Sequence, residues 1–437
     1  MAEGRRGTGP ASPGSESPDA ADVTPNAPGG VALAADLATR DARARGPARV
    51  KLTLTRFRSY RHLRLLAGPH SVVLTGANGV GKTNLLEAIS FLAPGRGLRG
   101  ARLAEIDHHV DDDRRADDGA ATEPAQDKLG WAVAAELITP NGPLAIGTGA
   151  EAGETRKRVV KIDGVNARGQ TALAGRVPMV WLTPKMDRLF TEGAAERRRF
   201  LDRLVFGFDA AHAGRLVGFE RAMRERSRLL RAGGADDGWL RALEDAMATN
   251  AVAVAAARLE IVGRLRAACA LAEGPFPRPD LNVIGPVEQA LPGRPALAVE
   301  DDLRARLRVG RRADAESGGA ALGPHRSDLV VGFQAAGRSG KRPIAAEQCS
   351  TGEQKALLLA MILANARLLA VEAGGAPLLL LDEVAAHLDP DRRAALFEQI
   401  LALGGQAWLT GTDPALFAPL AGRARRLRVA AGQVEED

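Results

Sequence analysis

The chain has 437 residues, of which 45% are hydrophobic and 4% aromatic, and a formal net charge of +6. This length allows more than one domain, and the hydrophobic content supports sizeable cores. The positive charge suits a nucleic-acid partner without requiring one. The two cysteines, Cys269 and Cys349, lie far apart and match no metal-binding spacing, which argues against a disulfide scaffold or a zinc site.

The N-terminal residues 1–48 consist largely of Ala, Gly, Pro, Ser and Asp and contain no aromatic residue. Such a composition cannot bury enough apolar surface to offset the entropy lost on ordering. We predict a disordered tail here, with the folded part beginning near Arg49. No uninterrupted apolar run approaches the roughly 18 residues of a membrane span, and no charged-then-apolar leader is visible. We therefore expect a cytoplasmic protein without a membrane partner.

Residues 49–194 show the period-two alternation that is typical of strands. Two strands precede residue 76, and three more follow at residues 132–139, 144–149 and 158–167, with Asp163-Gly164 as a hairpin turn. We predict a mixed sheet in this half. Between these groups, residues 107–127 are charged and aperiodic, which predicts a solvated loop. A metal site at His108, His109 and three nearby aspartates is a weaker alternative.

The segment VVLTGANGVGKTNLLEAISFL, residues 72–92, places an apolar strand, a glycine-rich turn and an apolar helix in succession. The turn matches G-x-x-x-x-G-K-T, in which backbone N–H groups and a helix N-terminus face a phosphate. Lys82 is predicted to contact the β- and γ-phosphates of a nucleotide, and the Thr83 hydroxyl to bind Mg²⁺. The candidate nucleotide-binding residues are Gly76, Ala77, Asn78, Gly79, Val80, Gly81, Lys82, Thr83 and Asn84.

From Ala195 onward the apolar residues recur at helical spacing, for example at Phe200 and Leu204 and again at Trp239, Leu243 and Met247. The polar segment RAGGADDG separates the two runs and predicts a turn. We predict a short antiparallel helical arm within residues 195–310, between an N-terminal ATPase lobe at 49–194 and a C-terminal half at 311–437.

The segment PLLLLDEVAAHLD, residues 377–389, predicts a buried strand that ends at Asp382 and Glu383. Such a pair can simply cap a strand, but the upstream phosphate loop favours a catalytic role. We predict that Asp382 binds Mg²⁺ opposite Thr83. Glu383 is predicted to orient and deprotonate the attacking water.

The segment QCSTGEQK, residues 348–355, precedes a long apolar helix, and Ser350 or Thr351 with Glu353 predicts its N-cap. The helix end then offers amides and a positive dipole to a phosphate, although an ordinary capped helix is the alternative. STGEQ resembles the signature loop of the ABC-type ATPases, and LDEVAAHLD resembles their Walker B segment running into the D-loop at Asp389.

This resemblance implies an α/β fold, namely an ABC-type ATPase head with a mixed sheet, flanking helices and an inserted arm. It also implies that the signature residues of one subunit close over the ATP of another. Those residues are Ser350, Thr351, Gly352 and Glu353. Thr412 stands where transporters of the superfamily use a switch histidine, and the segment Trp181 to Phe190 lacks a Q-loop glutamine. Slow ATP hydrolysis is therefore the expectation.

Further segments resemble the RecF family of bacterial recombination mediators. They are LTRFRSYRHLRL, GRGLR at Gly95–Arg99, ERRRFLD at Glu196–Asp202, GPHRSD at Gly323–Asp328 and LTGTD at Leu409–Asp413. The resemblance implies a weak ATPase that uses ATP and Mg²⁺ and forms an ATP-dependent homodimer. It further implies DNA binding at junctions of duplex with single-stranded gaps, and RecO and RecR as partners in loading RecA during DNA repair and replication. Cys349 and Ser327 depart from the family's usual residues.

Clustered arginines suggest where DNA binds, because guanidinium groups neutralise backbone phosphates. The candidates are Arg197, Arg198 and Arg199, with Arg96 and Arg99 behind them. Those at the start of the arm can equally form ion pairs with Glu192, Glu196 or Asp202, and both interpretations stay open.

Several other functions are compatible with parts of this pattern. One is another SMC-like or overcoming-lysogenization-type ATPase head, although an SMC protein needs a coil far longer than arm helices of about 40–50 Å. A transporter ATPase subunit should carry a Q-loop glutamine and a switch histidine. The third alternative is a nucleotide-gated binding module without meaningful turnover. Whether Glu383 acts in hydrolysis distinguishes this module from an ATPase.

Overall fold

The computed structural model describes residues 48–108, 130–150, 157–234, 236–272, 274–334, 343–430 and 432–437. The predicted disordered tail lies outside these residues apart from Ala48, and the predicted loop at 107–127 lies outside them from His109 onward. The alternative metal site at His108 and His109 therefore falls mainly outside the described ranges. Within those ranges no cluster of three or more His, Cys, Asp or Glu side chains could bind a metal.

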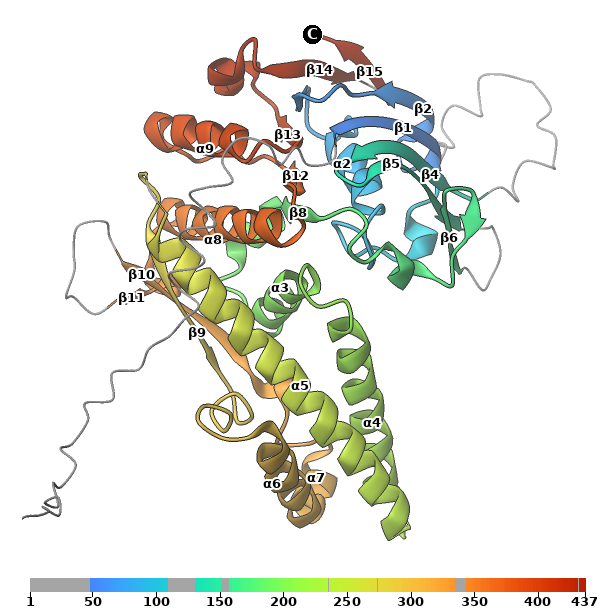
Figure 1. The fold of residues 1–437 in the computed structure, drawn as a ribbon, viewed down its shortest axis with the longest axis vertical. Coiled ribbons are helices and arrows are strands. Elements are labelled where there is room, and N and C mark those ends of the chain that lie inside the picture. Colours follow the sequence, from blue (N-terminus) through green and yellow to red (C-terminus); the bar gives the residue numbers. More distant parts are fainter. Residues whose placement is uncertain are drawn as a thin grey trace, which may run out of the picture. The chain divides into compact units, whose positions relative to one another are not determined.

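The first sheet is antiparallel throughout, with strand order β2-β1-β4-β5-β6-β7 (Figure 1). Its strands are β1 (Ala48–Phe57), β2 (Tyr60–Leu66), β4 (Ala132–Thr139), β5 (Gly142–Ala150), β6 (Arg158–Ile162) and β7 (Val165–Asn166). Alternate residues of β4 are buried and exposed, as expected where one face of a sheet packs on a core.

The second sheet has the order β15-β14-β3-β13-β12-β8 and is parallel except for β15. Its strands are β3 (Ser71–Thr75), β8 (Met179–Leu182), β12 (Leu378–Leu381), β13 (Ala407–Gly411), β14 (Ala424–Ala430) and β15 (Gln433–Glu436). This mixed sheet confirms the predicted fold class. However, the prediction that the N-terminal strands form one mixed sheet is wrong, because only β3 and β8 join strands from the C-terminal half.

The physical reason for this division is connectivity. Short connections join β1 to β2, β4 to β5 and β6 to β7 as antiparallel hairpins, whereas β3 leads into helix α2 (Lys82–Ser90) and pairs in parallel with distant strands. Leu85 and Ile89 of α2 belong to one buried cluster with side chains of both sheets, including Leu54 and Trp408. The phosphate loop therefore begins a helix that is fixed between the two sheets.

The predicted arm is confirmed as a helical region. It contains α3 (Ala194–Phe206), α4 (His212–Ala232), α5 (Asp237–Ala270) and α6 (Ala296–Val309), and Figure 1 shows α4 and α5 side by side. Helix α7 (Arg311–Ser317) follows directly after the predicted end of the arm. A three-stranded antiparallel sheet, β9 (Arg278–Ile284), β10 (Asp328–Gln334) and β11 (Ile344–Ala345), lies in order β11-β10-β9. Met247 is buried in the arm as predicted, whereas Trp239 is 50% exposed and does not belong to the seam.

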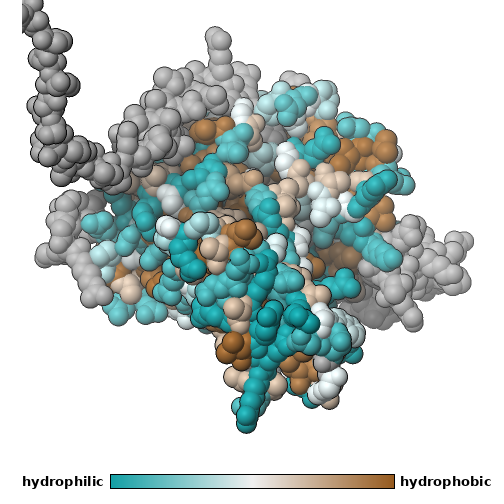
Figure 2. All heavy atoms as spheres, turned by 60° about the horizontal axis from the view of Figure 1, so that its bottom comes forward, coloured by the Kyte–Doolittle hydropathy of each residue, from teal (hydrophilic) through white to brown (hydrophobic). Residues whose placement is uncertain are grey.

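Two helices, α5 and α8 (Thr351–Glu372), are long and apolar enough to cross a membrane by length and composition alone. The apolar window is 83% buried within the protein in α8 and 50% buried in α5. Core helices of globular proteins have this character. In Figure 2, hydrophilic residues cover much of the visible face, and hydrophobic residues lie among them in small groups.

Candidate functional site

The phosphate loop connects β3 to α2, and its glycines are required by the space around them. Gly81 has φ +113°, and a Cβ there would lie 2.6 Å from Ser59 Oγ. At Gly76, with φ +144°, a Cβ would lie 2.4 Å from the carbonyl oxygen of Val429. Only glycine fits both positions, so the loop can curl closely against its neighbours.

Lys82 is the first residue of α2, and its amine lies within the curve of the loop. The Nζ atom donates hydrogen bonds of 2.7 Å to the carbonyl oxygens of Gly76 and Ala77. Burial lowers the pKa of Lys82, and the nearby carboxylates of Glu383 and Asp382 oppose that shift. Lys82, the predicted phosphate contact, therefore lies close enough to the predicted carboxylate pair for their charges to interact, as a single nucleotide site requires.

Asp382 connects the phosphate-loop helix α2 with strand β13. Thr83 Oγ1 donates to Asp382 Oδ1 at 3.0 Å, and Thr410 Oγ1 donates to the same oxygen at 2.7 Å. A hydroxyl and a carboxylate so close together are suitable ligands for Mg²⁺, which prefers oxygen donors and keeps several waters or phosphate oxygens. The residues present thus fit the metal that the sequence predicts.

Glu383 follows Asp382 in a left-handed backbone conformation, with φ +50°. Such a conformation costs roughly 1–3 kcal/mol for a residue other than glycine, so neighbouring groups must stabilise it. The amide N–H of Glu383 donates to Thr410 Oγ1 at 2.9 Å. Thr410 therefore contacts both members of the carboxylate pair. Sequence reasoning missed it, although LTGTD contains it.

The parallel sheet explains why these residues meet. Leu381 of β12 pairs with Leu409 of β13, and Gly411 of β13 pairs with Thr75 of β3. The carboxyl ends of the three strands therefore lie at one edge, where Gly76, Asp382 and Thr412 follow them. Open α/β sheets bind ligands at this edge. Thr412 is exposed there, next to the strand that precedes the phosphate loop.

The signature segment forms the predicted cap of α8. Ser350 is the N-cap residue, and its Oγ accepts a hydrogen bond of 3.4 Å from the amide of Glu353. Glu353 Oε2 accepts in return from the Ser350 amide at 2.9 Å and from Ser350 Oγ at 2.8 Å, and these two hydrogen bonds lower the pKa of Glu353. Ser350 and Thr351 are exposed. The N-terminus of α8 is therefore a preorganised, accessible end with a positive dipole.

Asp389, the predicted D-loop residue, caps α9 (Pro390–Ala402) by accepting a hydrogen bond of 2.8 Å from the amide of Arg392. The side chain is exposed, so capping leaves it accessible. The segment in the Q-loop position forms β8 and the short 3-10 helix η5 (Pro184–Arg188), which begins at the same sheet edge beside Asp382.

Three of the candidate DNA arginines lie at the start of α3, and the structure gives them different environments. Arg197 donates two hydrogen bonds of 2.7 Å to Asp328, and Arg198 donates to the carbonyl oxygen of Ser327 at 2.7 Å. Arg199 pairs with Glu196, as the ion-pair alternative predicted, and its side chain remains 69% exposed. Packing therefore accounts for Arg197 and Arg198.

The remaining two candidates follow α2. Arg99 donates to Asn84 Oδ1 at 2.8 Å, so it lies beside the first turn of the phosphate-loop helix, and it also pairs with Glu87. Arg96 is exposed. Arg96, Arg99 and Arg199 are all exposed, so each stays a prediction for DNA contact.

A buried ionic cluster joins two segments that the sequence analysis singled out. Arg258 of α5 donates to both carboxylate oxygens of Asp202, at 2.8 and 2.9 Å, and to the carbonyl oxygen of Pro324 at 2.7 Å. Burial raises the pKa of Asp202, but hydrogen bonds from His212 and Arg258 outweigh it and leave the pKa lowered. The ERRRFLD and GPHRSD segments therefore meet at the base of the arm.

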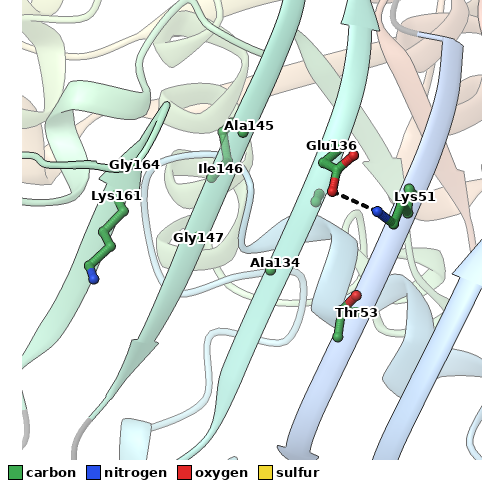
Figure 3. A pocket seen from close by; sticks show the side chains of 10 residues that line it. Lys51, Thr53, Ala134, Glu136, Ala145, Ile146, Gly147, Lys161 and Gly164 are labelled. Atoms are coloured by element: carbon green, nitrogen blue, oxygen red, sulfur yellow. Dashed lines mark hydrogen bonds and ion pairs between the residues drawn. The ribbon is translucent and has the colours of Figure 1, made fainter.

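The outer face of the antiparallel sheet carries a shallow trough that is built from other residues than the nucleotide site (Figure 3). Thr53, Ala134 and Gly147 occupy neighbouring register positions on its floor. Lys51 pairs with Glu136 at 2.8 Å on one side, and Lys161 lies across from them.

Comparison with known proteins identifies the family of this chain. The family described as "RecF/RecN/SMC N terminal domain" matches residues 50–410. A curated protein of Mesorhizobium japonicum, "DNA replication and repair protein RecF", is 47% identical over 88% of this chain and 96% of its own length. A protein of Brucella suis with the same name is 46% identical over 88% of this chain and 95% of its length. The chain belongs to the RecF family.

The fold agrees with this assignment. A solved structure described as the recombination mediator protein RecF-ATP in the RecFOR pathway has a TM-score of 0.74 and 19% identity, over 90% of this chain and 99% of that chain. A second, described as RecF-ATPrS, has a TM-score of 0.72. The family match and the curated relatives confirm the predicted RecF resemblance and the role in DNA replication and repair, and the solved structures agree with the predicted ATPase-head fold. As a RecF protein, the chain belongs to an ATPase family of the ABC/SMC type.

Thr410→Val is expected to lower kcat for ATP hydrolysis by about 10-fold, because the Glu383 amide loses its acceptor and Asp382 its donor, and an unpaired buried group costs about 1–3 kcal/mol. Thr410→Ser preserves the hydroxyl and should hydrolyse ATP within about twofold of the parent protein, a range expected for a retained hydrogen bond. Steady-state hydrolysis of the three proteins tests this. Equal rates for the valine and serine variants would show that the Thr410 hydroxyl does not contribute to hydrolysis.

Proposed function

We propose that this RecF protein binds ATP with Mg²⁺ between two copies of the chain. The loop at Gly76–Lys82 binds the phosphates, Thr83 and Asp382 provide the metal ligands, and the α8 end at Ser350–Glu353 of a second copy contacts the γ-phosphate. Mg²⁺ would neutralise charge on the transferred phosphoryl group and orient its oxygens. The observation that carries this proposal is the contact of Thr83 with Asp382 at 3.0 Å, because it joins the two halves of the site.

A second copy can complete the site, because the signature cap and the phosphate loop of one chain are both accessible. Ser350 and Thr351 are exposed at the α8 N-terminus, as are Ala77, Asn78 and Gly79 in the loop. A nucleotide bound in the loop presents its γ-phosphate outward, where a helix N-terminus is a favourable partner. ATP would thus promote dimerisation, and slow hydrolysis with Glu383 as general base would reverse it.

We further propose that the ATP-bound dimer binds DNA at junctions of duplex with single-stranded gaps and promotes RecA loading with RecO and RecR. The names of the curated relatives, which refer to replication and repair, support this role, as does a solved neighbour described within the RecFOR pathway. The exposed side chains of Arg96 and Arg199 provide charge for phosphate contacts. Chromosomal DNA as the ligand implies action in the cytoplasm.

Three functional regions follow from this proposal. We assign residues 49–194 and 311–437 to the head, since both contribute strands to the parallel sheet, and residues 195–310 to the arm. Residues 1–48 are assigned to an N-terminal tail that precedes the head.

DNA binding should depend on ATP and on DNA structure. We expect the tightest binding to gapped DNA, and log K should fall linearly with log salt with a slope of about 0.9 per duplex phosphate contacted. Arg96→Ala and Arg199→Ala should each reduce that slope by about one. Titrations of gapped, duplex and single-stranded DNA with ATP, alongside Lys82→Ala, measure this. Equal affinity for all three would contradict the junction assignment.

A further inference from the structure

Lys355 is a buried lysine in helix α8, directly before the apolar run of that helix. It is 3% exposed, whereas the residues that follow it, from Ala356 to Ala364, are buried and apolar. Burying an ammonium group is unfavourable unless partners compensate for the lost water. A lysine at this place therefore requires a structural or functional explanation.

The hydrogen-bond partners of Lys355 identify its task. Its Nζ donates to the backbone carbonyl oxygen of Glu383 at 3.3 Å and to Asp187 Oδ2 at 3.3 Å. Asp187 lies in η5, the segment that takes the place of a glutamine-bearing Q-loop. One ammonium group thus connects the signature helix, the segment after β8 and the backbone of the predicted general base.

Two hydrogen bonds hold the backbone of Glu383, one at its amide and one at its carbonyl oxygen. Thr410 Oγ1 accepts from the Glu383 amide, and Lys355 donates to the Glu383 carbonyl. Because Glu383 has a positive φ of +50°, its backbone would relax if these contacts were lost. A carboxylate that moves by about 1 Å can lose about 100-fold in rate, since a general base must be within hydrogen-bond reach of the water.

Lys355 also shares a rigid element with the signature. Ser350 caps α8, and five residues along a helix correspond to about 7.5 Å. A shift of the helix end that contacts a phosphate therefore carries Lys355 with it.

We propose that Lys355 is a positioning residue for Glu383: it places the general base of one subunit according to the position of the helix whose N-terminus contacts the partner's nucleotide. This inference rests on the proposed function, because it requires the signature to act in a second copy. The Asp187–Lys355 ion pair then provides the link between η5 and the catalytic carboxylate.

The test compares Lys355→Met with the parent protein. Methionine keeps the buried stem and removes the charge, so kcat for hydrolysis should fall by about 10-fold to 100-fold. KM for ATP and ATP-driven dimerisation should change by less than about twofold, because Lys355 contacts neither the phosphate loop nor the signature cap. Lys355→Arg should recover most of kcat. Lys185→Met is the matched control, since Lys185 is a 70%-exposed lysine that pairs with Glu196.

A double-mutant cycle separates positioning from a general loss of structure. If Lys355 acts through Glu383, Lys355→Met should have no further effect on the residual hydrolysis of Glu383→Gln. The proposal would be overturned if the loss of kcat in the double variant equalled the product of the losses in the two single variants. A kcat of Lys355→Met equal to that of Lys185→Met would also overturn it. Failure of the parent protein to dimerise with ATP would instead contradict the proposed function. Melting temperatures of all variants report whether a loss arises from unfolding.

Discussion

Glu383→Gln is expected to reduce the rate of ATP hydrolysis by about 100-fold or more, since general-base catalysis contributes about 10²–10⁴-fold. Glutamine has the same shape and can still accept a hydrogen bond from water, but it cannot take up the proton. In the proposed binding mode ATP contacts Lys82 and the loop amides, which this substitution leaves intact. The ATP-bound dimer should therefore form and persist.

Two measurements check this expectation. Phosphate release gives the rate, and light scattering with ATP and Mg²⁺ gives the proportion of dimer and its lifetime. Glu353→Gln serves as a comparison, because it changes a carboxylate of the signature cap instead of the one beside Asp382. Hydrolysis by Glu383→Gln at the parent rate would exclude Glu383 as the base. It would also favour a nucleotide-gated binding module.

Lys82→Ala should weaken ATP binding by about 10-fold to 100-fold, because a hydrogen bond to a charged group contributes about 1.5–3 kcal/mol and each 1.4 kcal/mol is a factor of ten. ATP-dependent dimerisation should be lost at ATP concentrations that saturate the parent protein. Equilibrium binding of a fluorescent ATP analogue and light scattering at the same nucleotide concentrations provide the readout.

The matched control for Lys82→Ala is Lys51→Ala. Lys51 is a lysine of the outer sheet face whose side chain is 53% exposed and paired with Glu136. An exposed ion pair contributes at most about 1 kcal/mol, so this variant should bind ATP like the parent. If both lysine variants dimerise with ATP, the phosphate loop is not the site that controls assembly.

Local sequence patterns were sufficient for the parts of the site that are contiguous in the chain. The phosphate loop needs glycines where φ is positive, and Gly76 and Gly81 show that requirement in the structure. The N-cap of α8 depends on residues three apart, so Ser350 and Glu353 could be recognised in advance. The strand before Asp382 likewise shows as a run of leucines.

Contacts between distant segments could not be derived in this way. Thr410 lies 28 residues from Asp382, and Lys355 lies 28 residues from Glu383, so no periodicity connects them. For Arg197 the sequence left open DNA contact or an ion pair with a nearby acid, whereas its partner in the structure is Asp328, 131 residues away. Tertiary packing decides which charges are paired, because strength of pairing depends on distance and burial and not on order in the chain.

The sequence by itself determined the chemistry of this RecF protein, since a phosphate loop, a carboxylate pair and a capped helix each depend on a few adjacent residues. Only the tertiary structure decided how that chemistry is assembled. The parallel order of β3, β13 and β12 brings three remote segments to one edge, and the side chains of Thr410 and Lys355 stabilise Glu383 there. Strand pairing and burial are properties of the whole chain, so no short segment contains them.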